Sequence, residues 1–399
     1  MESRVKSWSR REWLAAASVG AAACSSAPEP EAESATVEIP SYLADYADTY
    51  AQDPHAAGLE WFRNARSGLF LHYGLYSIPG GEWNGKQVMN VNDATKPVAE
   101  WIQFHAQIPV TEYAKLADSF TAENFDADFI TDLALDAGMK YVNITTRHHD
   151  SFCLFKTNET DFQSLNTPAK RDLVAELAES CRKKNLGLFL YYSHGRDWKH
   201  PHAPTNEWSR SCRPAYAEPQ PEYVPDDEVD LDQYVEFMDR QITELLTQYG
   251  PVAGIWLDGE GVPKAYAKQL AGGLDEAIDL LKVRELYAKI NELQPQCLIS
   301  YKRGLTGTED FRTPERITFG FDSSEKPLEI NTTLQAHSWG YNKHTKHRKT
   351  ADEIMELLES SWKIPANVCL NTGPTGDGTI VAEEEAVLRE IGRRVRENG

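Results

Sequence analysis

The clearest candidate for a chemically active side chain in this sequence is a carboxylate that follows a short apolar run. Asp258 comes directly after residues 254–257, which are typical of a buried strand, and Trp256 lies on the same face because strand side chains alternate. A carboxylate beside an indole at a strand end suits a nucleophile next to a sugar-binding wall. The alternative is that Asp258 caps the helix that follows, a common role for Asp.

Two adjacent histidines form a second candidate. His148 and His149 follow Thr145-Thr146-Arg147 at the end of another predicted strand. A zinc site would need three or four converging ligands, and the sequence has no His-Glu-x-x-His motif and no C-x-x-C pair. The pair therefore predicts hydrogen bonds to hydroxyl groups, with one buried structural histidine and one exposed histidine as the alternative. We expect no metal ion and no organic cofactor.

Several other side chains could complete a site for breaking a glycosidic bond. Retention of configuration needs a second carboxyl group about 5–5.5 Å from the nucleophile. Glu315 and Glu329 are the candidates, both in predicted long loops that follow the strand before Arg303. The dipeptide Glu82-Trp83 in another predicted loop offers a carboxylate and a ring face together, although exposure at the surface is the alternative.

These side chains must be positioned by alternating strands and helices. Apolar runs predict strands at 68–73, 141–146, 186–193, 254–258, 297–301 and 367–371. Amphipathic periodicity predicts helices at 128–136, 173–184, 235–248, 277–293, 351–361 and 382–396. Periodicity alone fits both a closed (β/α)8 TIM-like barrel and an open doubly wound sheet.

The polar residues favour the barrel. His72, His149, His194 and Asp258 each stand at the end of a different predicted strand. In a barrel all strands deliver their carboxyl ends to one rim, where the chemistry is done. An open sheet usually gathers its site at one switch point with a glycine-rich phosphate loop, and the sequence has no G-x-G-x-x-G or Walker motif.

The charge balance limits the partners. The 399 residues include 61 acidic and 41 basic side chains, for a formal net charge of −20. Such a surface repels nucleic acid and anionic membranes, so we expect a neutral ligand recognised by local contacts. Ten Trp and 17 Tyr could supply ring faces for sugars.

The N-terminus predicts export. Arg10-Arg11, a short apolar stretch and Cys24 are typical of a twin-arginine signal, and the apolar run of about ten residues is too short to span a bilayer. Cys24 is either a lipidation site or the neighbour of a plain cleavage site, and we expect a periplasmic or envelope location. Residues 25–38 are an acidic linker, so the expected domains are 1–38 and 39–399. The five other cysteines could form one disulfide, and the sequence does not indicate which pair.

Taken together, these segments resemble glycoside hydrolase family 29, the α-L-fucosidases. The most specific stretches are Thr145-Thr146-Arg147-His148-His149-Asp150 and Trp256-Leu257-Asp258-Gly259. Further matching stretches run in family order at 61–74, 170–174, 190–193, 249–255, 338–342 and 371–379. The resemblance covers nearly all of the chain from about residue 59 onward.

The resemblance implies a (β/α)8 barrel and double displacement through a fucosyl-enzyme. It places the nucleophile on Asp258 and favours Glu315, in an Asp-Phe-x-Thr-Pro-Glu stretch, over Glu329 as the acid/base. Glu329 is otherwise a substrate contact, and Trp339 is the aromatic residue near the fucose methyl group. The remaining fucose contacts that it implies are His72, Glu82, Trp83, His148, His149, Trp256, Arg303, and a tyrosine at Tyr191 or Tyr192.

The sequence departs from the family pattern in two places. Around Glu329 it reads Leu-Glu-Ile-Asn-Thr-Thr where the family has Trp-Glu-x-Cys-Met-Thr. It also ends after the predicted barrel, without the β-sandwich that usually follows. We expect an exo-acting retaining α-L-fucosidase acting on fucosylated oligosaccharides or polysaccharides. The alternatives are a retaining glycosidase for another sugar, such as an α-galactoside, and a non-catalytic sugar-binding protein of the envelope. An apolar wall near Trp339 or Phe70 would favour fucose.

Overall fold

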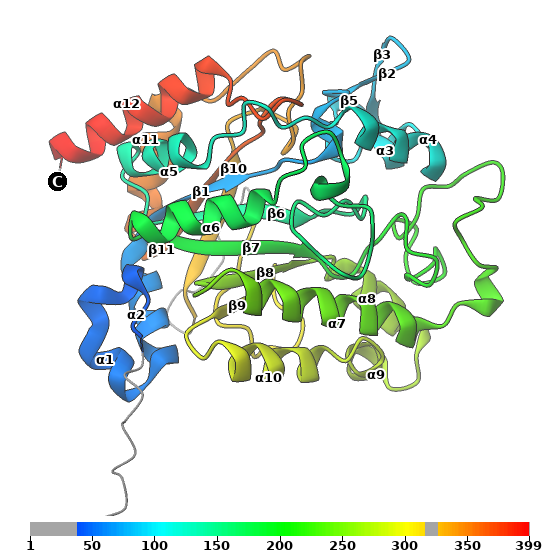
Figure 1. Ribbon diagram of the computed structural model, residues 1–399, viewed down its shortest axis with the longest axis horizontal. Helices are drawn as coiled ribbons and strands as arrows, with labels where there is room; N and C mark the ends of the chain where they lie inside the picture. Colours follow the sequence, from blue (N-terminus) through cyan, green and yellow to red (C-terminus); the bar gives the residue numbers. More distant parts are fainter. Residues whose placement is uncertain (1–37, 316–325, 399) are drawn as a thin grey trace, which may run out of the picture. The chain divides into compact units, whose positions relative to one another are not determined.

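Seven parallel strands form the sheet at the centre of the fold (Figure 1). The computed structural model describes residues 38–315 and 326–398, and all elements lie in a unit that begins at Ile39. In spatial order the strands are β10 (Leu328–Thr333), β11 (Ala366–Thr372), β1 (Ser67–Leu71), β6 (Tyr141–Arg147), β7 (Gly187–Ser193), β8 (Gly254–Asp258) and β9 (Leu298–Tyr301). Their side chains are almost all buried, as expected for a parallel sheet covered by helices.

A short irregular segment, residues 310–315, joins the two edge strands. The Asp310 N–H donates to the carbonyl of Ile299 in β9 at 2.8 Å, and the carbonyl of Arg312 accepts from Glu329 N–H in β10 at 2.9 Å. Side chains from β6, β8 and β10 also meet inside the ring, as Tyr141 and Trp256 both hydrogen-bond to Glu329. The predicted barrel-type α/β fold is confirmed, with this segment in the place of an eighth strand.

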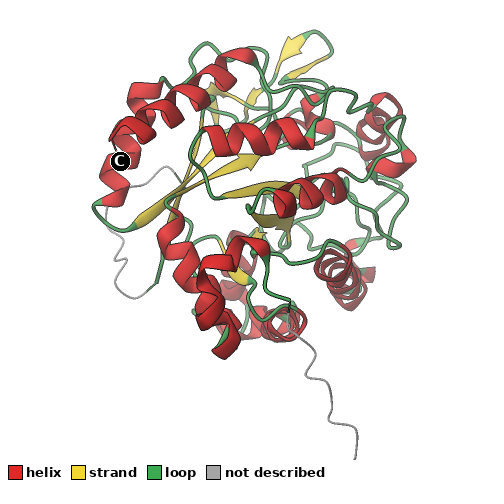
Figure 2. Ribbon diagram, turned by 60° about the vertical axis from the view of Figure 1, so that its left-hand side comes forward, coloured by secondary structure: helices red, strands yellow, loops and turns green. Residues whose placement is uncertain are grey.

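Amphipathic helices cover the outside of the sheet (Figure 2). They are α5 (Ala127–Asp136), α6 (Leu173–Lys183), α7 (Leu231–Gln248), α8 (Gly261–Tyr266), α9 (Gly273–Leu280), α10 (Val283–Leu293), α11 (Ala351–Trp362) and α12 (Ala382–Asn398). Short 3-10 helices occur at Ser41–Tyr46, Leu75–Ser77, Lys115–Ser119, Ser164–Asn166, Asp226–Glu228 and Ala267–Gln269. The single helix predicted at 277–293 is wrong, because Lys282 adopts a left-handed φ of 48° that separates α9 from α10.

The N-terminal helices close one end of the barrel. α1 (Ala47–Gln52) and α2 (Pro54–Ala65) lie at the opposite end of the strands from the hairpin of β2 (Glu82–Trp83) and β3 (Lys86–Gln87) (Figure 1). β4 (Met89–Asn90), β5 (Asp93–Pro97), α3 (Ile102–His105) and α4 (Val110–Ala114) follow that hairpin. Trp61 and Phe62 of α2 pack against Tyr141, Phe189 and Phe311 inside the ring. The opposite rim is left for the site.

Further findings concern a strand, the cysteines and the remaining described residues. The loop predicted around Glu329 is wrong, because residues 328–333 form β10, and all six are buried although four of them are polar. Cys153, Cys181, Cys212, Cys297 and Cys369 are all buried and free, so the described residues contain no disulfide. They also contain no β-sandwich and no helix that is long and apolar enough to cross a membrane.

Candidate active site

A cavity of about 150 Å³ opens at the carboxyl ends of the strands. Most of its lining comes from the strands of the sheet other than β11, or from residues that directly follow them, and Glu100, Trp101, Glu315 and Trp339 come from connecting segments. The lining residues are Phe70, His72, Glu100, Trp101, His148, His149, Tyr191, Trp256, Asp258, Lys302, Glu315, Asn331 and Trp339. Eight of these were predicted from the sequence as site residues, and Phe70 was named as part of a wall.

Asp258 ends β8 and is almost fully buried in this cavity. Its Oδ2 accepts a 2.7 Å hydrogen bond from the Tyr191 hydroxyl and lies 3.8 Å from Nε2 of His149, and its Oδ1 accepts from the N–H of Gly259. Burial alone would raise the pKa of Asp258, but the adjacent ammonium of Lys302 at 2.8 Å outweighs it and holds that pKa well below its usual range. The carboxylate is therefore ionised, as a nucleophile must be.

The backbone around Asp258 is fixed by contact between two loops. The N–H groups of His194 and Gly195, which follow β7, both donate to the carbonyl of Asp258, at 3.0 and 2.9 Å. A Cβ at Gly195 would lie only 2.4 Å from the carbonyl oxygen of Gly259, which itself has a left-handed φ of 99°. Glycine is required at both positions, and any side chain there would displace the strand end that carries the carboxylate.

Glu315 stands on the segment that closes the ring and faces the same cavity. Its Oε1 lies 2.9 Å from Nζ of Lys302, the atom that also contacts Oδ1 of Asp258. Two oxygens that contact one nitrogen at these distances are less than about 6 Å apart, which is compatible with the roughly 5–5.5 Å between the carboxyl groups of retaining glycosidases. Glu315 is thus placed as the second carboxyl group.

The orientation of two histidine rings follows from their partners. The Ser193 hydroxyl donates to the carbonyl of Arg196 at 2.7 Å, so its oxygen accepts from Nδ1 of His149 at 2.6 Å. Nδ1 of His72 likewise donates to the side-chain carbonyl of Asn371 at 2.6 Å. Burial lowers the pKa of both rings, that of His72 to about 3, so both are neutral. Each Nε2 is then a hydrogen-bond acceptor, suited to a sugar hydroxyl.

Aromatic rings form the apolar part of the cavity wall. Phe70, Trp256 and Trp339 all contribute, and the Trp339 ring lies 5.2 Å from that of His72. The indole N–H of Trp256 donates to Oε1 of Glu329 at 3.0 Å, which turns the edge of that ring into the barrel interior. These faces can pack against the apolar side of a sugar ring.

A second Glu-Trp dipeptide occupies the place expected for Glu82-Trp83. Glu82 lies on the hairpin and pairs with Lys343 at 3.2 Å and His344 at 3.0 Å, and neither Glu82 nor Trp83 lines the cavity. Glu100-Trp101 lies there instead, and the Glu100 carboxylate accepts from the backbone N–H groups of residues 339 and 340 at 3.0 and 3.1 Å. The dipeptide itself does not identify the site, because it occurs five times in the sequence, beginning at residues 12, 60, 82, 100 and 207.

Three other predicted residues lie outside the cavity. Tyr192 points to the outer layer, because its neighbour Tyr191 takes the inward face of β7. Arg303 is exposed, and Lys302, which the sequence reasoning missed, supplies the cation instead. Glu329 is fully buried inside the barrel, where Tyr141 and Trp256 donate to it. Burial raises the pKa of Glu329.

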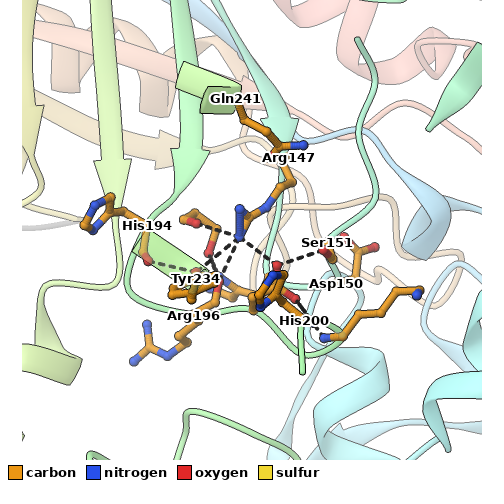
Figure 3. A network of polar contacts seen from close by, with 12 residues as sticks. Arg147, Asp150, Ser151, His194, Arg196, His200, Tyr234 and Gln241 are labelled. Atoms are coloured by element: carbon orange, nitrogen blue, oxygen red, sulfur yellow. Dashed lines mark hydrogen bonds and ion pairs between the residues drawn. The ribbon is translucent and has the colours of Figure 1, made fainter. Parts of the chain in front are cut away.

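A buried polar network supports the loops that carry the histidines (Figure 3). Arg147, the last residue of β6, forms a 3.0 Å ion pair with Asp197, and both side chains are fully buried. The guanidinium also donates to the hydroxyl of Tyr192 at 2.6 Å, the carbonyl of Ser193 at 3.0 Å and the hydroxyl of Tyr234 at 3.3 Å. This network ties the end of β6, which directly precedes His148 and His149, to the end of β7 and the loop that follows it.

The arrangement can attack an acetal carbon with one carboxylate while a second carboxyl group serves the leaving oxygen. Residues 38–315 and 326–398 contain no group of three or more His, Cys, Asp or Glu side chains placed to hold a metal ion. Two carboxyl groups at this spacing are the working parts of retaining sugar hydrolysis. The class of protein that the fold and the site define is that of the glycoside hydrolases.

Comparison with known proteins narrows this class. A family model described as alpha-L-fucosidase matches residues 35–399, and the chain belongs to that family. Tissue alpha-L-fucosidase of Mus musculus is 27% identical over 347 residues, which cover 85% of this chain and 70% of that protein. Overall the chain spans 64–70% of the length of the curated relatives it matches.

Solved structures of the same family are also similar. Alpha-L-fucosidase AlfC from Lactobacillus casei, solved with its alpha-L-fucose product, superposes with a TM-score of 0.72 at 28% identity, covering 86% of this chain and 98% of that one. Isoenzyme 1 from Paenibacillus thiaminolyticus gives 0.69 at 31% identity, covering 87% and 77%. At these identities the likeness extends beyond the fold to the family.

Proposed function

We propose that this protein removes terminal α-L-fucosyl residues from glycans by double displacement, with Asp258 as nucleophile and Glu315 as acid/base. One observation carries the proposal: both carboxylates contact the same Nζ atom of Lys302 inside the cavity. That contact brings them within the distance at which one carboxylate can attack the anomeric carbon while the other serves the glycosidic oxygen.

The two steps use the site as follows. Asp258 attacks the anomeric carbon, the glycosidic bond breaks, and Glu315 gives its proton to the leaving oxygen. Glu315 then takes a proton from water, which attacks the anomeric carbon and releases Asp258. The Tyr191 hydroxyl holds Asp258 in place for both steps. The second step restores the starting configuration, so the product is α-L-fucose.

The lining of the cavity supports a neutral deoxy sugar as substrate. Neutral Nε2 atoms of His72 and His149 and the Glu100 carboxylate accept hydrogen bonds, which suits hydroxyl donors. The Phe70 and Trp339 rings offer an apolar wall, which favours a methyl group over a hydroxymethyl group because a buried hydroxyl would lose its partners there. A cavity of about 150 Å³ has room for one sugar ring, which supports exo action.

Azide rescue tests the proposal directly. The parent protein should hydrolyse an aryl α-L-fucoside, and Asp258→Ala and Glu315→Ala should not do so at an appreciable rate. Azide added to Asp258→Ala should yield the β-fucosyl azide, and azide added to Glu315→Ala should yield the α-azide, as identified by NMR. Rescue of Glu315→Ala with the wrong anomer, or of neither variant, would contradict these roles.

A matched substrate tests the sugar. The aryl α-L-galactoside differs from the α-L-fucoside by one hydroxyl at C6. We expect kcat/KM for the fucoside to be higher by about tenfold or more, the order of effect of one unpaired hydroxyl against an apolar wall. Equal values would favour the galactoside alternative, and binding of fucose without turnover of any α-L-fucoside would favour a sugar-binding protein.

We also propose that residues 1–38 direct export to the periplasm or envelope. Arg10-Arg11 and the short apolar stretch before Cys24 support this. Replacing both arginines by lysine should retain the protein inside the cell. Detergent phase partitioning of the parent and of Cys24→Ala would distinguish lipidation from plain cleavage. If Cys24 is lipidated, the parent should enter the detergent phase and Cys24→Ala should stay in the aqueous phase.

A further inference from the structure

The Lys302 side chain lies between the two carboxylates of the proposed reaction. Its Nζ is 2.8 Å from Oδ1 of Asp258 and 2.9 Å from Oε1 of Glu315, within hydrogen-bonding distance of both. The side chain is only 20% exposed, so water screens these interactions weakly. Neither the strand pattern nor the motifs of the sequence pointed to this residue.

The backbone of Lys302 is also unusual. It has a φ of 47°, the left-handed region that non-glycine residues seldom adopt, directly after the last residue of β9. The carbonyl of Lys302 accepts a 2.8 Å hydrogen bond from Thr313 N–H, which ties the turn to the ring-closing segment that carries Glu315. Such a conformation costs free energy and is found where surrounding contacts impose it, often at functional sites.

Other charged and titratable groups face this cluster. Glu260, two residues beyond Asp258, adds a third carboxylate near Lys302, and the charge of Arg196, from the loop after β7, also favours the ionised form of Asp258. Burial lowers the pKa of each nearby histidine, so those rings carry no charge at neutral pH. The nearby histidines are His72, His148 and His149. Lys302 is the cation that contacts both reacting carboxylates.

We propose that Lys302 is a catalytic residue that serves as the shared counterion of Asp258 and Glu315. The inference rests on the proposed function. In the first step the Asp258 carboxylate becomes a neutral ester while Glu315 gives up its proton and becomes a carboxylate. In the second step Glu315 regains a proton from water and Asp258 is released as a carboxylate. One negative charge thus moves between two oxygens that contact the same ammonium.

The chemical nature of lysine fits this task. Its ammonium is a compact charge with three donors, so it can bond to both carboxylates at once and stay in place when either becomes neutral. A counterion shared in this way avoids reorganising charge in the cavity during each step. Arg303, the next residue, is exposed and serves as a matched comparison.

The pH dependence of kcat/KM for an aryl α-L-fucoside tests the proposal. The acidic limb of the profile requires an ionised Asp258, and the basic limb requires a protonated general acid. Removing the cation disfavours the ionised form of both carboxyl groups. Both limbs should therefore move to higher pH. In Lys302→Met and Lys302→Gln each shift should be about one pH unit or more. We expect kcat/KM near neutral pH to fall at least about tenfold. Lys302→Arg should restore the limbs in part, and Arg303→Met should leave them in place.

The outcomes separate this proposal from simpler ones. Limbs that stay in place in both uncharged variants would show a structural role only and overturn the proposal. A shift of the acidic limb alone would show that Lys302 pairs with Asp258 and is not shared. A shift in Arg303→Met with none in Lys302→Met would assign the cation to Arg303. Thermal unfolding of each variant establishes that it is folded.

Failure of the proposed function would be seen separately. If the parent protein hydrolyses no α-L-fucoside, no pH profile of kcat/KM can be measured. The side-chain carboxyl groups can then be titrated by carbon-13 NMR instead. Two carboxyl titrations that move to higher pH together in Lys302→Met would still support the shared counterion. Their absence would overturn it independently of the substrate.

Discussion

The Tyr191 hydroxyl donates a 2.7 Å hydrogen bond to Oδ2 of Asp258. The two residues lie on adjacent parallel strands, where Tyr191 pairs with Trp256 and Ser193 with Asp258, so both side chains point into the ring. Burial and the neighbouring carboxylate raise the pKa of Tyr191, which keeps the phenol protonated and able to donate. The bond therefore orients the carboxylate at every working pH.

Tyr191→Phe should reduce kcat/KM by about 10- to 100-fold, because a hydrogen bond to a charged group contributes about 1.5–3 kcal/mol. Steady-state kinetics on an aryl α-L-fucoside would measure the loss. Tyr192→Phe is the matched control: its hydroxyl accepts from Arg147 in the outer layer, so it should lower the unfolding free energy and leave kcat/KM near the parent value. Equal kinetic losses in both variants would contradict the assignment.

The Glu-Trp dipeptides at residues 82–83 and 100–101 should differ sharply in importance. Glu100→Gln removes a carboxylate from the cavity wall, and we expect kcat/KM to fall about tenfold or more, since bonds to an ionised acceptor are the strong ones. Glu82→Gln alters a partly exposed ion pair with Lys343 and should change kcat/KM less than about threefold. The reverse order of effects would restore the expectation drawn from the sequence.

Glu329 should matter for stability rather than for proton transfer. In Glu329→Gln the amide oxygen can still accept from Trp256 and Asn331, and the amide nitrogen can donate to the Tyr141 hydroxyl, so activity should stay within about fivefold of the parent. Large loss of activity with azide rescue would make Glu329 the acid/base.

The same variant makes a pH prediction. Because burial raises the folded-state pKa of Glu329 above its unfolded value of about 4.3, the parent should lose stability as pH rises from that value through the folded pKa. Glu329→Gln should lack this loss. Urea unfolding at a series of pH values would measure the difference, and parallel stability curves for parent and variant would refute it.

The Arg147–Asp197 pair should be a major determinant of stability. Asp197→Ala leaves a fully buried guanidinium without its counterion, and the expected loss is about 3–5 kcal/mol of unfolding free energy. Asp275→Ala at the exposed Arg284 pair should have a much smaller effect, because water screens that pair. Denaturant unfolding of the two variants would compare them, and similar losses would show that the network does not support the loops.

Much of the architecture could be predicted because apolar runs and amphipathic periods are strong signals. The six predicted strands correspond to β1, β6, β7, β8, β9 and β11, and the polar residues at their ends correctly indicated the rim. β10 was missed because it faces a barrel interior that is polar at this level. The Asn331 amide donates to the Glu329 carboxylate there, and these inward polar side chains leave the strand without an apolar pattern.

The parts of the site that were missed depend on conformation. A left-handed turn at Lys302 decides which of two adjacent cations enters the cavity, and no local pattern encodes that turn. The strand alternation that selects Tyr191 over Tyr192 depends on register, which is fixed by pairing with neighbouring strands. The choice between Glu82 and Glu100 depends on how a hairpin folds back. In each case the type of side chain could be read from the sequence, but the sequence did not determine whether that side chain points into the cavity.

The segment that completes the ring has a consequence for how activity is acquired. Glu315 is the one lining residue that stands on residues 310–315. A form of the protein in which β9 and β10 have not yet been joined would already present Asp258 and the histidines to a sugar, but would lack the group that protonates the leaving oxygen. Recognition of the sugar and competence to cleave it therefore depend on different contacts, because the main-chain hydrogen bonds that close the barrel are also the ones that place Glu315.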